Sequence, residues 1–104
     1  MLHRGFADWA GRLAEEEERL DAVNDALDAL DTDRFHSAVR RINDLNLTGC
    51  AARIADSRDI LDAERLLEEL YAAILLRIEY IRPLAREEEL GERGYMDWEY
   101  ERGV

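Results

Sequence analysis

The sequence predicts an all-α protein: a small bundle of three main helices over residues 6–30, 33–46 and 58–82, a short fourth helix over 84–90, and an irregular or extended C-terminal tail. Two observations lead to this fold class. Apolar residues recur at three- and four-residue steps along two long stretches, which is the periodicity of an amphipathic helix. The stretch 60–81 also contains the run LYAAILL, which is stable in water only where neighbouring helices cover it.

The first helix is predicted from two heptad rows. One row consists of Phe6, Leu13, Leu20 and Leu27, and the other of Trp9, Val23 and Leu30. Glu16 is the single polar defect in the second row. Asp8 lies near the start of the helix, where the helix dipole favours a carboxylate. The segment therefore reads as an amphipathic helix with one face in the core.

A row of carboxylates, which we name the acidic ridge, is predicted on the opposite side of this helix and comprises Glu15, Glu18, Asp21, Asp25 and Asp28. Residues 8–33 carry a net charge of −8, whereas residues 34–58 carry +3. In an antiparallel hairpin these two segments would attract each other, which is the simplest explanation for the basic stretch. We expect the acidic ridge to be a partner-binding surface.

The second helix follows from Phe35, Ala38, Val39, Ile42 and Leu45, which repeat at helical spacing. We expect it to cover residues 33–46, to break near Gly49, and to resume for a turn or two up to residue 56, because glycine weakens a helix interior. A helix that continues straight through Gly49 is the alternative.

The third helix, 58–82, is predicted to be the centre of the fold. Its core or oligomer seam consists of Leu67, Leu70, Ile74, Leu76 and Ile78. It is not expected to cross a membrane, because charged residues such as Glu68 and Arg77 interrupt it. Pro83 predicts a stop or a kink, because proline lacks an amide hydrogen and restricts the residue before it.

The tail, residues 91–104, is predicted to be an acidic aromatic segment attached to a single helical domain over residues 1–90. Aromatic and apolar side chains alternate with acidic ones there, which suits an extended segment. We expect the tail contacts to fold back over the apolar middle of the third helix, with a docking motif for a partner as the alternative; they are Tyr95, Met96, Trp98 and Tyr100.

The sequence offers little for catalysis, metal binding or a cofactor. Neither His3 nor His36 has a glutamate at the spacing of helical di-iron sites. Cys50, the lone cysteine, lies among small residues as a buried hydrophobe does. A helical magnesium site could use Glu64 with Glu68 or Glu15 with Glu18. However, Ala72 or Ala73 occupies the position that would complete the second pair, and Glu15 with Glu18 fits a solvated face. No glycine-rich phosphate loop occurs in the sequence. We therefore expect a non-catalytic protein without metal or cofactor.

The net charge of −11 predicts the partner's chemistry. An acidic chain is repelled by nucleic acids and anionic membranes, so we expect no direct binding to either and instead a partner protein with a basic surface. The role would be that of an inhibitor, such as a phage counter-defence or antitoxin-like factor. Mimicry of a phosphate strand would be loose, with about one net charge per 4–5 Å of the first helix against one per ~1.7 Å of duplex.

A self-associating structural or adaptor module, for example a homodimer through the third helix, is the alternative function. The absence of a signal-peptide pattern and the single cysteine lead us to expect a cytoplasmic protein.

Overall fold

The computed structural model describes the backbone of residues 8–103 and the side chains of residues 8–90. Over this part the chain forms four helices and no strand: α1 (Trp9–Asp28), α2 (Phe35–Asp44), α3 (Thr48–Ala55) and α4 (Ile60–Gly103). The predicted all-α fold class is confirmed. The expected start of the first helix at Phe6 lies outside the described residues.

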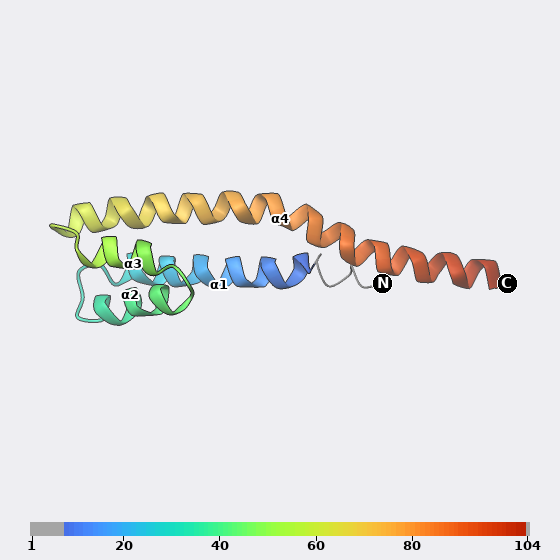
Figure 1. The fold of residues 1–104 in the computed structure, drawn as a ribbon, viewed down its shortest axis with the longest axis horizontal. Helices are drawn as coiled ribbons and strands as arrows, with labels where there is room; N and C mark the ends of the chain where they lie inside the picture. Colours follow the sequence, from blue (N-terminus) through green and yellow to red (C-terminus); the bar gives the residue numbers. More distant parts are fainter. Residues whose placement is uncertain (1–7, 104) are drawn as a thin grey trace.

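The molecule is organised around two long helices. Figure 1 shows α1 and α4 side by side, running in opposite directions, with α2 and α3 against the end where α1 stops and α4 begins. α1 contacts α4 and α2, and α3 contacts α2 and α4. The overall extents are 66 × 23 × 19 Å. The molecule is therefore elongated, and its bundle is complete only at one end.

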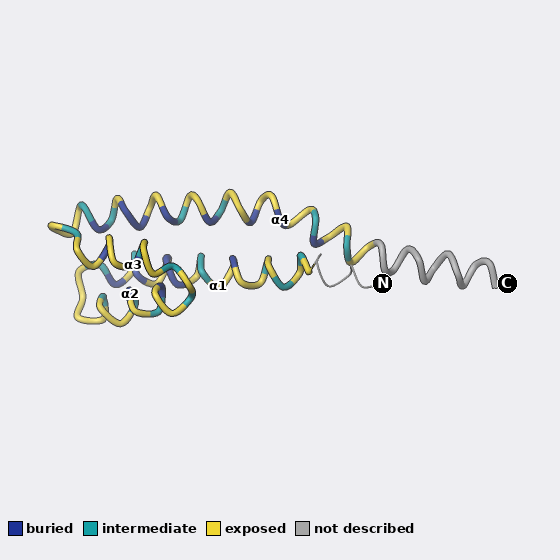
Figure 2. The backbone as a smooth tube through the Cα atoms, viewed as in Figure 1, coloured by how far each residue is buried: buried dark blue, intermediate teal, exposed yellow. Residues whose placement is uncertain are grey.

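The core lies at that complete end and takes residues from every helix. The largest fully buried side chains are Val23, Ile42, Ile54, Leu67, Ile74 and Ile78. Figure 2 shows the buried residues of α4 along the side that faces the other helices. Each such side chain stabilises the fold by about 1.5–3 kcal/mol. The predicted packing of the helical faces into one core thus holds.

Side-chain caps fix the starts of α1 and α4. The Asp8 carboxylate accepts a hydrogen bond from the amide of Gly11 at 3.1 Å, and the Asp59 carboxylate accepts one from the amide of Asp62 at 2.8 Å. These bonds satisfy amides that have no partner inside the helix. Hydrogen bonds from the Arg65 side chain and from the Arg58 amide lower the pKa of Asp62 below its usual value of 3.8.

The helix break expected near Gly49 lies instead at Asn46. Gly49 is inside α3, while Asn46 has a φ of 67° directly after the C-cap residue Leu45. Among residues with a side chain, asparagine is one of the few that tolerate this left-handed conformation. The break therefore falls on the asparagine, and the alternative of one continuous helix is wrong.

The end of the chain differs from the sequence prediction. Pro83 lies inside α4, and Figure 1 shows a change of direction in the orange part of α4, near residue 80 on the colour bar. The expected kink is present, but the expected stop and separate helix over 84–90 are wrong. One proline removes only one backbone hydrogen bond from a long helix, and the flanking residues favour helix.

The irregular or extended tail is likewise corrected, because the backbone of α4 is helical to Gly103. A short alternation of aromatic and acidic residues does not outweigh helix propagation from the segment before it. The domain boundary predicted at residue 91 falls inside α4. The predicted contacts of Tyr95, Met96, Trp98 and Tyr100 lie outside the residues whose side chains are described.

Candidate protein-binding surfaces

The first candidate surface is the exposed side of α1, which we name the outer acidic face and define as Glu18, Asp21, Asp25 and Asp28. All of these residues are exposed to solvent, as the sequence predicts. Glu15 of the predicted acidic ridge is also exposed but lines a groove beside Trp9. The structure therefore groups four of the five ridge carboxylates and places Glu15 on a different surface.

Part of the outer acidic face is already paired. Arg41 of α2 reaches Asp25 at 2.6 Å and Asp21 at 3.2 Å. This contact is the attraction between the first and second helices that the charge distribution predicts. The side chains of Asp21 and Asp25 remain more than half exposed, and such surface pairs contribute only about 0–1 kcal/mol. Both carboxylates thus stay within reach of another molecule.

Glu16, the defect in the heptad row, is buried and has two arginine partners. Its carboxylate lies 2.8 Å from Arg19 Nη1 and 3.2 Å from Arg77 Nε. Arg19 also donates from Nε to the carbonyl of Leu45 at 2.9 Å. This network joins α1 to α4 and to the end of α2. The one sequence signal for this network is Glu16 itself, a glutamate at a core position of the heptad pattern.

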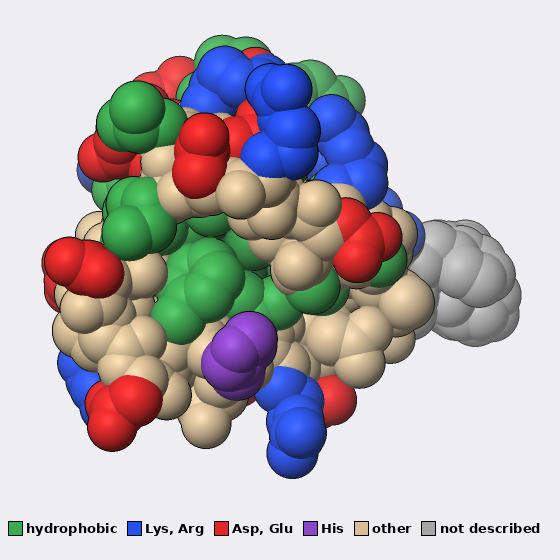
Figure 3. Space-filling model, turned by 90° about the vertical axis from the view of Figure 1, so that its left-hand side faces the viewer, with side chains coloured by type: hydrophobic (Ala, Val, Ile, Leu, Met, Phe, Trp, Pro, Cys, Tyr) green, Lys and Arg blue, Asp and Glu red, His purple; other side chains and the backbone are tan. Residues whose placement is uncertain are grey.

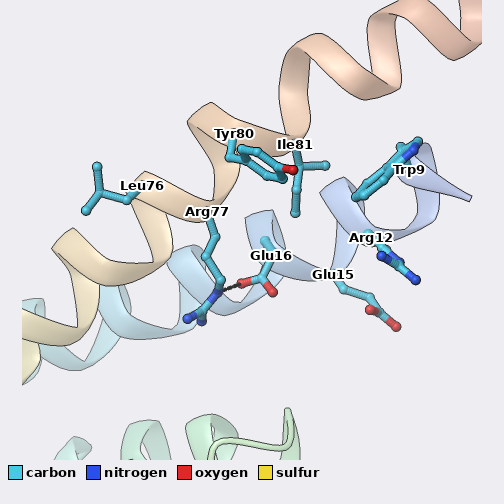
Figure 4. A pocket seen from close by; sticks show the side chains of 8 residues that line it. All are labelled: Trp9, Arg12, Glu15, Glu16, Leu76, Arg77, Tyr80 and Ile81. Atoms are coloured by element: carbon cyan, nitrogen blue, oxygen red, sulfur yellow. Dashed lines mark hydrogen bonds and ion pairs between the residues drawn. The ribbon is translucent and has the colours of Figure 1, made fainter. Parts of the chain in front are cut away.

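The second candidate surface is a groove between α1 and α4, which we name the open-end groove. It has a volume of about 550 Å³ and is lined by Trp9, Arg12, Glu15, Glu16, Leu76, Arg77, Tyr80 and Ile81. Figure 4 shows these side chains on the first turns of α1 and on the facing part of α4, where Arg77 and Glu16 point toward each other and Leu76 points away from α1. The Arg12 guanidinium lies 4.9 Å from the centre of the Trp9 ring. Sequence reasoning did not identify this groove, because its two walls are about 65 residues apart in the chain.

The predicted seam of the third helix divides between the core and this groove. Leu67, Leu70, Ile74 and Ile78 are buried, as expected for a core seam. Leu76 is 67% exposed and Tyr80 is 68% exposed. Of the two roles predicted for the seam, Leu76 does not take the core role, because it projects from the opposite side of α4 to Ile74. Its role in an oligomer stays a prediction.

A second hollow, of about 500 Å³, lies between α2 and α3, with Phe35, His36 and Ile54 in its lining. Figure 3 views the complete end of the molecule, where hydrophobic side chains lie in a hollow beside a histidine, and His36 is the only histidine among the described residues. Its lining is mainly apolar and carries no carboxylate.

The described residues contain no group of three or more histidine, cysteine, aspartate or glutamate side chains that could hold a metal ion. Cys50 is a free, partly buried thiol. Within residues 8–103, none of the helices combines the length and apolar character that spanning a membrane requires. The features that remain as candidate sites are the outer acidic face and the open-end groove.

No known family model, curated protein or solved structure matches the chain.

Proposed function

We propose that the protein is a non-catalytic helical module that binds a basic surface of another protein through the outer acidic face of α1. One observation carries this proposal: four exposed carboxylates follow one side of a rigid helix, and among the described side chains only Arg41 forms an ion pair with them. Carboxylates held on a packed helix lose little conformational freedom on binding. The surface is therefore suited to arginine and lysine side chains on a partner.

The charge of the whole chain supports the same role. A net charge of −11 attracts a basic protein over distances of about 8–10 Å in physiological salt and repels nucleic acid. Occupation of a surface that otherwise binds nucleic acid would make the protein an inhibitor, as an antitoxin-like or phage counter-defence factor is. Arg41 pairs with Asp21 and Asp25, which lowers the charge density of the outer acidic face further below that of a phosphate strand. The proposed mechanism is therefore competition for the basic surface and not close mimicry of a nucleic acid. We place this activity in the cytoplasm, in keeping with the free thiol of Cys50.

The experiment compares three baits in a bacterial lysate at low salt, with bound proteins identified by mass spectrometry. The first bait is the wild-type chain. The second carries Glu18→Gln, Asp21→Asn, Asp25→Asn and Asp28→Asn. The third is a control of equal net charge that carries Glu64→Gln, Glu68→Gln, Glu79→Gln and Glu87→Gln on α4. We expect basic proteins on the wild-type and control baits that are depleted at least about tenfold on the second, because several charged contacts are lost together.

Equal capture by all three baits would contradict the proposal, since binding would then depend on net charge or on another surface. Circular dichroism of each bait shows whether the helices remain intact. The substituted side chains of α1 are exposed, so the changes are expected to leave the fold in place.

A further inference from the structure

The face of α4 that forms the open-end groove is the continuation of a face that α3 covers. A hollow of about 180 Å³ lies between the two helices there, and its lining includes Cys50 and Ile54 of α3 and Leu66, Leu70 and Ala73 of α4. Beyond Ala73 the same side of α4 presents Leu76 and Tyr80, and no described helix covers them. The α1–α4 pair thus has a third layer at one end and lacks it at the other. A helical face of this kind is stable when another helix packs on it.

The charges around the open-end groove distinguish it from the rest of the molecule. Its lining contains two arginines, Arg12 and Arg77, and two glutamates, Glu15 and Glu16. The groove is therefore locally neutral in a chain whose net charge is −11. Such a lining neither attracts nor repels a partner through its net charge, and a surface that carries both signs can be complementary to itself.

The exposed apolar side chains of the groove also favour association. Leu76 and Tyr80 are 67% and 68% exposed, and neighbouring large apolar side chains on a surface often mark an interaction site. A two-fold contact buries about 800 Å² on each partner in a typical stable pair, which the elongated α1–α4 pair can supply.

We propose that the open-end groove binds the same groove of a second copy of the chain, so that the α1–α4 pairs of two copies form a four-helix layer around a two-fold axis. Leu76 and Tyr80 of one copy then lie against those of the other. Arg12 of each copy lies opposite Glu15 of its partner. Because the axis is two-fold, this contact occurs twice in the dimer. The outer acidic face lies on a different side of α1 and stays exposed, so each pair presents two of these faces.

Sedimentation equilibrium of the purified chain tests the contact. We expect a mass of twice 12.1 kDa for the wild type at about 50 µM, a concentration well above the dissociation constant of a stable homodimer. Leu76→Asp should raise the dissociation constant about 100-fold, because the buried charge occurs in both copies. Leu61→Asp is the matched control, since Leu61 is a comparably exposed leucine, at 74%, on the first turn of α4, and it should leave the dimer unchanged.

Charge exchange tests the pairing across the axis. Arg12→Glu alone places glutamates on both copies at the contact, and Glu15→Arg alone places arginines there, so each variant alone should sediment as a monomer. An equal mixture of the two variants should form a heterodimer, because the opposing charges are again of opposite sign.

A monomeric wild type, a dimer that survives Leu76→Asp, or a mixture that stays monomeric would each overturn the inference. These outcomes are independent of the function proposed above. Leu76→Asp does not alter the outer acidic face, and the bait comparison can fail or succeed whatever the oligomeric state of the chain.

Discussion

Replacing Ile74 by alanine should lower the free energy of unfolding by about 2–5 kcal/mol. Ile74 is fully buried and belongs to the core cluster at the complete end of the bundle, which takes residues from all four helices. Truncation removes three carbons from this core and leaves a cavity that rigid helices close only in part. Urea denaturation followed by circular dichroism at 222 nm measures the change.

Leu61→Ala is the control for this prediction, because Leu61 is exposed on the same helix. It should change the free energy of unfolding by less than about 0.5 kcal/mol. Equal effects of the two substitutions would mean that the side of α4 that carries Ile74 is not buried. The described packing of α4 on α1 and α3 would then be incorrect.

Replacing Glu16 by leucine should destabilise the protein by about 1–3 kcal/mol, although leucine completes the apolar heptad row. The substitution removes the carboxylate that pairs with Arg19 and Arg77. The Arg19 side chain is mostly buried and would keep only its hydrogen bond to the Leu45 carbonyl. An uncompensated, partly buried guanidinium costs more than the added methyl groups contribute. Thermal and urea unfolding of the variant at neutral pH measure the effect.

Glu17→Leu serves as the neighbouring control, because Glu17 is exposed and its change should be within about 0.5 kcal/mol. A Glu16→Leu variant more stable than the wild type would show that the ion pairs contribute nothing and that Glu16 is only a defect in the seam.

The helices that carry regular apolar rows could be predicted from the sequence. Val23 and Leu27 indicate the inner side of α1, and Leu67, Ile74 and Ile78 indicate that of α4, because heptad spacing places them on one face. The contact between Arg41 and the carboxylates of α1 also followed from the charge of the two segments. Each of these predictions needed only local spacing or summed charge.

Other features depend on which segments meet in space. Arg77 is a partner of Glu16 across 61 positions of the chain, and no local pattern reveals it. The run LYAAILL is apolar on every side, so it does not indicate that Leu76 is exposed while Ile74 is buried. Pro83 bends α4 without ending it, because a long helix tolerates one missing hydrogen bond.

The two surfaces have separate physical roles. The outer acidic face offers charge to a partner, and the open-end groove offers apolar area with balanced charge to a second copy. A dimer that presents two acidic faces would bind a partner with paired basic surfaces more tightly than a single chain does, because the second contact is intramolecular.

The salt dependence of binding tests the central claim most directly. The partner recovered on the wild-type bait is purified, and its dissociation constant for the wild type is measured by fluorescence anisotropy between about 0.05 M and about 0.5 M sodium chloride. Binding through the outer acidic face predicts that affinity falls steeply as salt rises and that the variant with Glu18, Asp21, Asp25 and Asp28 neutralised shows a much flatter dependence. An affinity that stays constant over this range would contradict the account.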